Sequence, residues 1–442
     1  MQTSFAPDQL NDPQTAHSEK IIRKCVHCGF CTATCPTYVL LGDELDSPRG
    51  RIYLIKDMLE KQRQPDEELV THVDRCLSCL SCMTTCPSGV NYMHLVDHAR
   101  AYINERYRRP WHQRAYRWAL AAILPHPGRF RLALEFSVLA KPFRKLLSKF
   151  SLTKPLSAML ELAPASLSRP VLAQNATAHG EARGRVIMLQ GCAEPVLRPQ
   201  YRAAAIRLLT RFGYDVVFAR QESCCGALVH HMGREEGAQA SARANVDAWM
   251  TEIERGDVAA IITTASGCGT VMKDYGHLLR DDPDYAEKAR ICADLTKDVS
   301  ELLETFELSD DLRPESEIGG LSVAYHPACS LQHGQQIGDL PKKLLEKAGF
   351  SVRVPTEAHL CCGSAGTYNI LQPDISAQLA SRKVENIGNL APDVVATGNI
   401  GCAVQIGKMM NLPVLHTVEL LDWATGGPMP DAILDRKQGA TL

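Results

Sequence analysis

The chain has 442 residues, of which 45% are apolar and 22% are charged, and its formal net charge is −2. These values fit a folded protein of two or three domains and argue against nucleic acid as the main partner. The 17 cysteines and an N-terminus without the apolar core of a secretory signal do not indicate a disulfide scaffold, so we expect ligand thiols in the reducing cytoplasm. The chain contains no run of about 18 apolar residues, so the sequence predicts no membrane span.

Residues 1–22 are expected to form an N-terminal tail, followed by a domain over residues 23–100 that contains eight cysteines. They form two runs, CVHCGFCTATCP and CLSCLSCMTTCP, each with the spacing C-x2-C-x2-C-x3-C-P. In two-cluster bacterial ferredoxins such a run gives three thiolates to one 4Fe-4S cluster, and its fourth cysteine ligates the other cluster. The spacing therefore predicts two 4Fe-4S clusters, one held by Cys25, Cys28, Cys31 and Cys86 and the other by Cys76, Cys79, Cys82 and Cys35.

A pair of zinc knuckles is the alternative, but such sites use Cys-x2-Cys hooks and often histidine. The exchange of fourth ligands places the two clusters close together, which indicates transfer of single electrons rather than storage. Between the runs, Ser47-Pro48 begins a predicted helix, on which Arg49 and Arg51 are candidates to offset the negative charge of a cluster, with capping or surface roles as the alternative. The apolar positions of this helix are Ile52, Leu54, Ile55, Met58 and Leu59.

The next segment, residues 101–183, has no cysteine and is expected to be a basic helical connector. Basic residues interleaved with aromatic ones suit the interfacial zone of an anionic membrane, and peripheral membrane contact is one interpretation. An acidic partner surface suits the pattern equally, and a connector that packs on its own domains is the third interpretation. The basic residues are Arg106, Arg108, Arg109, Arg114, Arg117, Arg129, Arg131, Lys141, Arg144, Lys145 and Lys149, and the aromatic residues are Tyr107, Trp111, Tyr116, Trp118, Phe130, Phe136 and Phe143.

From Gly184 onward, short apolar runs alternate with amphipathic segments, a pattern typical of parallel sheets with helical crossovers. We expect two repeated cysteine-rich α/β domains, at residues 184–310 and 311–442, after the mainly helical ferredoxin domain. In the first repeat, strands are predicted at 186–191, 214–219 and 259–264, with helices at 201–213 and 235–253. In the second, strands are predicted at 321–326, 351–355 and 393–398, with helices at 341–350 and 374–390.

Each repeat carries a lone cysteine after its first strand, a Cys-Cys-Gly turn after its second and a cysteine after its third, all at the same end of the parallel strands. The lone cysteine and the turn are 32 residues apart in both repeats. A further iron-sulfur cluster, a zinc ion, a redox-active disulfide and buried structural cysteine are interpretations that spacing does not separate. The converging thiols are Cys192, Cys224, Cys225 and Cys268 in the first repeat and Cys329, Cys361, Cys362 and Cys402 in the second.

Other residues of the repeats are less specific. Cys292 has no counterpart in the second repeat and is expected to be core. The glycines of the turns, Gly226 and Gly363, are expected to let the backbone approach a ligand closely. Histidines flank the thiols, and a proton carrier or a satisfied polar group are the two interpretations for each. They are His230, His231, His326, His333 and His416.

A family resemblance rests on these motifs. The stretch CVHCGFCTATCPTYVLLGDELDSPRGRIYLIKDML, the run CLSCLSCMTTCPSGV and the segments TTASGCG and LCCGSAGTYNI resemble the iron-sulfur subunits of bacterial glycolate oxidase. The resemblance covers about residues 21–423. The order of parts is also similar to the iron-sulfur subunits of anaerobic glycerol-3-phosphate dehydrogenase and to lactate-utilisation proteins, and in part to heterodisulfide reductase.

The resemblance implies an electron-relay subunit of a flavin-dependent 2-hydroxy-acid dehydrogenase or oxidase. Such a subunit accepts electrons from an FAD-containing partner that oxidises glycolate or D-lactate, and passes them to a membrane quinone at the inner face of the cytoplasmic membrane. Relatives of the heterodisulfide reductase type use a further Cys-x2-Cys pair to hold an unusual cluster. Here Val271 and Gln405 stand at that offset from Cys268 and Cys402, so four-thiol sites are expected.

The chain lacks a G-x-G-x-x-G fingerprint at the start of an α/β unit, so flavin is expected on another subunit. Catalytic residues therefore stay unassigned. A thiol or disulfide redox subunit like heterodisulfide reductase is the second hypothesis, and a redox-sensing scaffold is the third.

Overall fold

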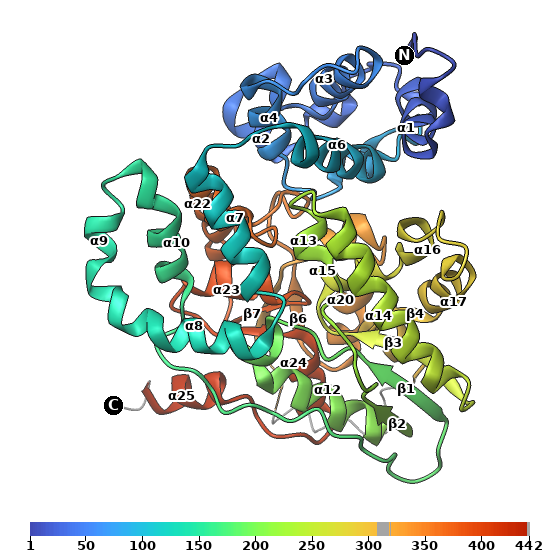
Figure 1. Cartoon of the computed structure of the whole chain (residues 1–442). Coiled ribbons are helices and arrows are strands. Elements are labelled where there is room, and N and C mark those ends of the chain that lie inside the picture. The colour runs from blue at the N-terminus through green and yellow to red at the C-terminus, as the bar shows by residue number, and fades with distance from the viewer. Residues whose placement is uncertain (307–317, 319, 440–442) are drawn as a thin grey trace.

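The computed structural model describes residues 1–306, 318 and 320–439. Figure 1 shows a helical N-terminal domain at one end of an α/β portion, with a helical connector along one side. The α/β portion contains two separate four-stranded parallel sheets. The expected fold class, a mainly helical ferredoxin domain followed by two repeated α/β domains, is thereby confirmed.

The N-terminal domain is held by a small apolar core between α1, α3, α4 and α6, in which Ile22, Ile55, Leu69 and Leu95 are fully buried. The side chain of Ser47 accepts a hydrogen bond from the Gly50 amide and so begins α3, as Ser-Pro predicted. The elements are η1 (Gln9–Asn11), α1 (Pro13–Lys24), η2 (Phe30–Thr32), α2 (Pro36–Leu41), η3 (Glu44–Asp46), α3 (Pro48–Glu60), α4 (Glu67–Asp74), α5 (Ser81–Thr85) and α6 (Tyr92–Arg106).

The connector is helical, as predicted, and is fixed to the N-terminal domain at its start. Arg109 and Arg117 both pair with Asp74, at 2.5 and 2.9 Å, so for these two basic residues the structure supports the interpretation in which the connector packs on its own domains. Figure 1 shows α8 and α9 extending away from the two sheets. The elements are α7 (Trp111–Ile123), α8 (Pro127–Ala140), η4 (Lys141–Phe143), α9 (Arg144–Leu147), η5 (Ser151–Thr153) and α10 (Lys154–Leu162).

The first repeat has the strand order β2-β1-β3-β4. The three predicted strands are present, and the fourth, β4, is a three-residue edge strand that the apolar pattern did not reveal. The strands are β1 (Gly184–Met188), β2 (Tyr214–Val217), β3 (Val258–Thr263) and β4 (Thr296–Asp298). The helices are α11 (Glu194–Leu197), α12 (Pro199–Arg211), α13 (Ala227–His230), α14 (Glu235–Ile253), α15 (Ser266–Met272), α16 (Tyr275–Leu278), α17 (Ala286–Leu295) and α18 (Val299–Leu303).

The second repeat has the matching order β6-β5-β7-β8, again with a three-residue fourth strand. A five-residue π-helical turn, η7 (Ser330–Gly334), directly follows Cys329. The strands are β5 (Ser322–Tyr325), β6 (Ser351–Arg353), β7 (Val394–Thr397) and β8 (Val414–His416). The helices are α20 (Leu340–Lys347), α21 (Tyr368–Leu371), α22 (Pro373–Gly388), α23 (Ile400–Gly407), α24 (Thr417–Ala424) and α25 (Asp431–Gly439).

The two repeats are joined by one continuous core. The largest buried cluster contains residues of both sheets, among them Val186 and Val323, together with Trp423 on α24. Across the helix pair α12 and α24, Arg207 and Arg211 both bond to the carboxylate of Asp422, which is 1% exposed. The shared core and these ion pairs therefore hold the two repeats together, and with them the carboxyl ends of the two sheets.

Candidate iron-sulfur sites

The two cysteine runs fold into loops of the same shape. Equivalent cysteines are 51 residues apart throughout the runs. In each loop the residue before the second cysteine and the residue after it have φ between 49° and 84°: His27 and Gly29 in the first loop, Ser78 and Leu80 in the second. Non-glycine residues adopt this conformation only at an energetic cost, so the surrounding structure holds it in place.

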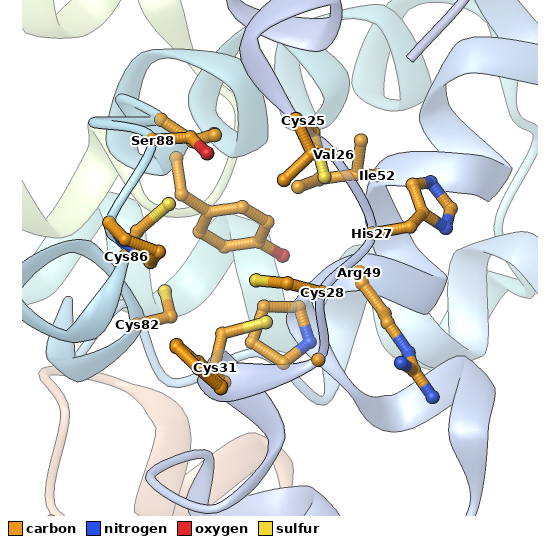
Figure 2. A pocket seen from close by; sticks show the side chains of 16 residues that line it. Cys25, Val26, His27, Cys28, Cys31, Arg49, Ile52, Cys82, Cys86 and Ser88 are labelled. Atoms are coloured by element: carbon orange, nitrogen blue, oxygen red, sulfur yellow. The ribbon is translucent and has the colours of Figure 1, made fainter.

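The first loop borders a cavity of about 430 Å³. Five cysteines line it: Cys25, Cys28, Cys31, Cys82 and Cys86. In Figure 2 the sulfur atoms of Cys28 and Cys31 face a space that Cys82 and Cys86 border from the other side. The structure thus brings together the four cysteines that the spacing assigned to one cluster, and with them Cys82, which the spacing assigned to the other.

A second cavity, of about 330 Å³, is lined by Cys35, Cys76, Cys79 and Cys82. These are the four cysteines that the spacing assigned to the other cluster. Cys82 borders both cavities, so the two thiol sets are immediate neighbours. The first set includes an exposed thiol, Cys28, whereas all four cysteines of the second are buried.

The chemistry of both cavities fits iron-sulfur clusters. Within the described part of the chain no carboxylate lines either cavity, and sets of thiolates alone are typical of such clusters. Tyr92 lines both cavities, and its buried hydroxyl has no hydrogen-bond partner among the described residues. An orphan donor beside thiols fits a cofactor that presents acceptor sulfur atoms.

Two arginines border these cavities, as their position on α3 suggested. Arg51 is 1% exposed, and it donates from Nη1 to the Cys35 sulfur over 3.8 Å and from Nη2 to Asp46 over 3.3 Å. Arg49 lies at the rim of the first cavity and pairs with Glu44. Burial raises the pKa of the Cys82 thiol, so nearby positive charge is required for the thiolate form.

In the first repeat the four predicted thiols meet at the carboxyl ends of β1, β2 and β3. The sulfur atoms of Cys192 and Cys224 are 3.4 Å apart, and hydrogen bonds to Cys224 and Cys268 raise the pKa of Cys225. The hydrogen bond between Cys192 and Cys224 is the largest cause that lowers the pKa of Cys224, to about 3. Cys292 is buried on α17, consistent with the expected core position.

The second repeat repeats this arrangement. The sulfur atoms of Cys329 and Cys361 are 3.7 Å apart, and hydrogen bonds with Cys361 and Cys402 lower the pKa of Cys362. All 17 cysteines of the chain, each within the described residues, are free thiols. Each repeat therefore offers four converging sulfur ligands.

The glycine of each Cys-Cys-Gly turn lies against the helix that follows it. Gly226 and Gly363 have φ of +84° and +85°. A Cβ atom on Gly226 would lie 3.2 Å from the carbonyl oxygen of Ala238, and one on Gly363 would lie 2.6 Å from that of Ser376. These glycines therefore allow the next helix, α14 or α22, to approach the turn; the expected approach of a ligand stays a prediction.

Sequence reasoning did not separate His326 from the other flanking histidines, but the structure does. His326 is 1% exposed, and its ring lies with the thiols of Cys362 and Cys402. Burial lowers its pKa. The signal in the sequence was its place three residues before Cys329, where the first repeat has Leu189.

The other four histidines have polar partners. His230 and His231 lie 3.3 and 3.7 Å from Asp97 on α6. His333 shares a 2.7 Å hydrogen bond with Thr84 of the N-terminal domain. His416 bonds to the Thr264 carbonyl and caps α24. These side chains join parts of the fold, which is the structural interpretation left open for them.

The second cavity lies against the second repeat. Cys79 and Cys361 belong to the same buried cluster, and Cys329 packs against it. Tyr368, also in this cluster, donates from its hydroxyl to the Arg75 carbonyl over 3.0 Å. The buried thiol set of the N-terminal domain and the thiols of the second repeat therefore share one packed cluster.

The loops that carry the two repeat quartets also touch each other. Ser266, two residues before Cys268, shares a 2.7 Å hydrogen bond with Ser330, which directly follows Cys329. Asn399 donates to Ser266 over 2.9 Å. The two quartets thus lie on either side of one polar contact between the repeats.

Comparison with known proteins agrees with this description. A family model described as a 4Fe-4S dicluster domain matches residues 24–90, and one described as a cysteine-rich domain matches residues 186–273 and 323–407. The first match confirms the prediction of two 4Fe-4S clusters.

Curated relatives match along the chain. It is 39% identical to the "Glycolate oxidase iron-sulfur subunit" of Escherichia coli (strain K12), over 96% of the chain and 99% of that protein. It is 30% identical to the "Probable glycolate oxidase iron-sulfur subunit" of Bacillus subtilis (strain 168), over 94% and 97%. "Lactate utilization protein A" of Exiguobacterium sp. (strain ATCC BAA-1283 / AT1b) is 27% identical over 54% of the chain and 96% of that protein. These matches confirm the resemblance inferred from the motifs.

Among solved structures, a hypothetical protein from Helicobacter pylori is similar with a TM-score of 0.55. The similarity covers 96% of this chain and 74% of that one, at 10% sequence identity. It therefore concerns the fold alone.

Proposed function

Because the chain belongs to the family of the glycolate oxidase iron-sulfur subunits, we propose that it relays electrons from a flavin-containing subunit toward a membrane quinone. The 2-hydroxy acid, glycolate or D-lactate, is then oxidised on the partner. When bound, 4Fe-4S clusters supply one-electron redox chemistry. In this proposal the eight cysteines of residues 25–86 hold the two clusters, with the fourth cysteine of each run exchanged.

The order of the thiol sites from surface to interior carries this proposal. The first cavity includes the exposed Cys28 and shares Cys82 with the second cavity. The second is lined by buried thiols, of which Cys79 packs in one cluster with Cys361 of the second repeat. Such an order supports a path that starts at the first cavity, continues through the second and ends in the repeats.

The flavoprotein would dock beside the first cavity. Val26 and Phe30, which line it, are 65% and 61% exposed. Exposed apolar side chains at the rim of a redox site suit a protein interface better than open solvent. Electrons would reach the exposed Cys28 side of the site from this face.

The connector is our candidate for the membrane contact. No helix among the described residues is long and apolar enough to span a membrane. Several large apolar side chains of the connector are nevertheless exposed, and arginines and lysines lie among them, as expected of an interfacial surface. Those more than half exposed are Trp111, Trp118, Leu132, Phe136, Val138, Leu139, Phe143, Leu146, Phe150 and Leu172.

Rapid-mixing reduction with the flavoprotein tests the relay. The chain and its flavoprotein are purified separately under anaerobic conditions, and the iron-sulfur absorbance is followed after glycolate is added. We expect bleaching only when both proteins are present, and re-oxidation when a soluble quinone follows. Reduction of the chain by glycolate without the flavoprotein, or none with it, would contradict the proposal.

A thiol and disulfide activity is the second candidate, favoured by the 3.4 Å separation of Cys192 and Cys224. Thiols this close form a disulfide after a small movement. It predicts that mass spectrometry of the air-oxidised, metal-free chain finds this pair bridged, and that the native complex reduces a disulfide substrate. If the native complex does not reduce a disulfide substrate, this second candidate is rejected and the electron relay remains as the proposed function.

A further inference from the structure

The thiols of the second repeat have a fifth neighbour with donor capacity. His326 directly follows β5, and beyond the thiol of Cys362 its ring nitrogens have no hydrogen-bond partner among the described residues. A ring nitrogen of His326 and the sulfur atoms of Cys362 and Cys402 all lie within 4.8 Å of one another. A buried imidazole whose polar neighbours are thiols is poorly satisfied, so a group that it binds together with them is the simplest reason for its place.

The separation of these atoms suits shared ligation of one group. The ring nitrogen of His326 and the sulfur atoms of Cys362 and Cys402 all lie within 4.8 Å of one another. The imidazole is therefore placed as a further ligand of whatever group these two thiolates hold, and histidine replaces cysteine on iron in some iron-sulfur centres.

The first repeat has no such donor at the equivalent place. The His326 amide donates to the Ala396 carbonyl at 2.8 Å, and the Leu189 amide makes the matching bond to Ile262 at 2.9 Å. The side chain of Leu189 lies in an apolar cluster with Cys192, Cys224 and Cys225. One scaffold therefore presents an imidazole in one repeat and an alkyl group in the other.

The two repeats also differ in a buried polar side chain on the helix that follows the Cys-Cys-Gly turn. Lys383 on α22 is 2% exposed and donates to the Glu357 carbonyl over 2.7 Å. The glycine contacts of the two turns align Ser376 with Ala238, so Lys383 aligns with Asn245 on α14. A cationic side chain thus stands in the second repeat where the first has a neutral amide.

We propose that the second repeat binds an iron-sulfur cluster with the His326 imidazole as a ligand beside its cysteine thiolates, whereas the first repeat binds through thiolates alone. A neutral imidazole in place of a thiolate leaves less negative charge on the site, and histidine ligation raises the reduction potential of other iron-sulfur centres. The second repeat is then the stronger electron acceptor. This inference deepens the proposed function and rests on it, because it takes the repeats as part of the relay.

Nitrogen hyperfine spectroscopy on the full chain tests the ligand. The chain is grown with 15N-histidine, prepared anaerobically with iron and sulfide, and examined by pulsed EPR in each paramagnetic state. We expect a strong histidine 15N coupling in the unsubstituted chain and in His333→Gln, a control histidine with hydrogen-bonded nitrogens. The coupling is expected to vanish in His326→Leu and His326→Cys.

The cysteine variant guards against a folding failure. His326→Cys is expected to keep the iron content, because a thiolate replaces the imidazole, while its potential falls. The reciprocal change, Leu189→His, is expected to introduce a histidine coupling in the first repeat. A coupling that persists in His326→Cys would overturn the proposal.

Metal analysis supplies the remaining outcomes. About eight irons per chain, the content of two 4Fe-4S clusters, would overturn the proposal because the repeats would hold no cluster. Zinc in the second repeat of an anaerobic sample would also overturn it. The relay is tested separately, by the flavoprotein assay. If that assay fails while the histidine coupling is present, the relay is wrong and the ligation by His326 stands.

Discussion

The two repeats have the same framework around their thiols. Their sheets have equivalent strand orders, β2-β1-β3-β4 and β6-β5-β7-β8. Gly226 and Gly363 adopt the same left-handed conformation against the following helix. Fourth strands end in matching capping boxes, at Asp298 and His416. This shared framework fixes where four sulfur atoms meet, independently of what surrounds them.

The surroundings of the thiols differ in charge. Glu222, two residues before the Cys-Cys pair of the first repeat, is half-buried, and desolvation raises its pKa to about 7. The second repeat has His359 at that place and also holds two buried basic side chains, His326 and Lys383. The same framework therefore surrounds the thiols with an acidic side chain in the first repeat and with basic side chains in the second. A basic environment stabilises the reduced, more negative form of a site, so we expect electrons to collect in the second repeat.

The largest expected effect comes from removing one Cys-Cys pair at a time. Serine at Cys361 and Cys362 should reduce electron transfer from flavoprotein to quinone by more than about 100-fold. Loss of a direct ligand is expected to exceed the 10–100-fold cost of losing an outer partner. Serine at Cys224 and Cys225 should reduce it less, because Cys79 contacts the second quartet. Steady-state quinone reduction by the complex measures both.

Iron content and low-temperature EPR serve as the control. Each double variant should lose the iron of its own repeat and keep the signals of both N-terminal clusters. Equal losses of activity in the two double variants would contradict the expectation that the second repeat contributes more to electron transfer than the first.

The buried charge gives the next effect. Lys383→Met should lower the reduction potential of the second-repeat site, because one positive charge is removed. At an effective dielectric constant of about 20, a unit charge about 4 Å away changes an energy by about 4 kcal/mol, so removal of a more distant charge is still expected to lower the potential by tens of millivolts. An EPR-monitored redox titration measures it. Lys347→Met, on the exposed side of α20, is the matched control and should change the potential little. An unchanged potential in Lys383→Met would show that charge does not distinguish the repeats.

The sequence predicted the elements that obey strong local rules. The cysteine runs, the doubled spacing of 32 residues and the long apolar strands all appear where they were expected. The edge strands β4 and β8 were missed because their three residues continue directly into α18 and α24, so no turn in the sequence separates the strand from the helix. The edge strand β6 is equally short but was predicted, because it stands where the repeat requires a second strand. The helix at 235–253 was predicted in full because its amphipathic pattern runs over 19 residues.

The relations between distant parts could not be predicted in this way. The contact of Cys79 with Cys361 depends on how the N-terminal domain sits on the second repeat, and no local pattern encodes that. His326 differs from the other histidines because Leu189 occupies the equivalent place in the first repeat, and this equivalence follows from the backbone hydrogen bonds of both sheets. Whether the N-terminal and repeat cysteines bind as assigned stays a prediction.

The contacts of the N-terminal domain with the two repeats should differ in their response to acid. Burial lowers the pKa of His98 to about 4 and that of His277 to about 2, and both line a cavity between α1, α6 and the first repeat. These imidazoles are neutral when folded and bind protons below about pH 6.5 when exposed, so they withdraw stability as the pH falls from 6.5.

Two kinds of group in the same cavity modify this expectation. Asp97 and Asp274 favour protonated histidine, and Asp97 raises the pKa of His230 against the effect of burial. Burial lowers the pKa of His17, which lines the cavity, and that of His231, which lies beside Asp97 outside it, so the net effect remains a loss of stability in acid. Hydrogen exchange at pH 7.5 and 5.5 should show loss of protection in α6 and α16 before α21. Earlier loss in α21 would contradict this order.

The smallest effect concerns the contact with the second repeat. Tyr368→Phe keeps the aromatic ring in the buried cluster with Cys79 and Cys361 but removes the hydroxyl that bonds to the Arg75 carbonyl. We expect the free energy of unfolding to fall by about 1 kcal/mol, the usual cost of one neutral hydrogen bond, in anaerobic denaturant titrations. Tyr325→Phe, in the same repeat, is the matched control, because the Tyr325 hydroxyl has no hydrogen-bond partner among the described residues. Since apolar packing rather than this bond holds Cys79 against the second repeat, the rate of quinone reduction should be unchanged in both variants. A large fall in that rate with Tyr368→Phe would mean that the hydroxyl itself sets the spacing of the two thiol sites.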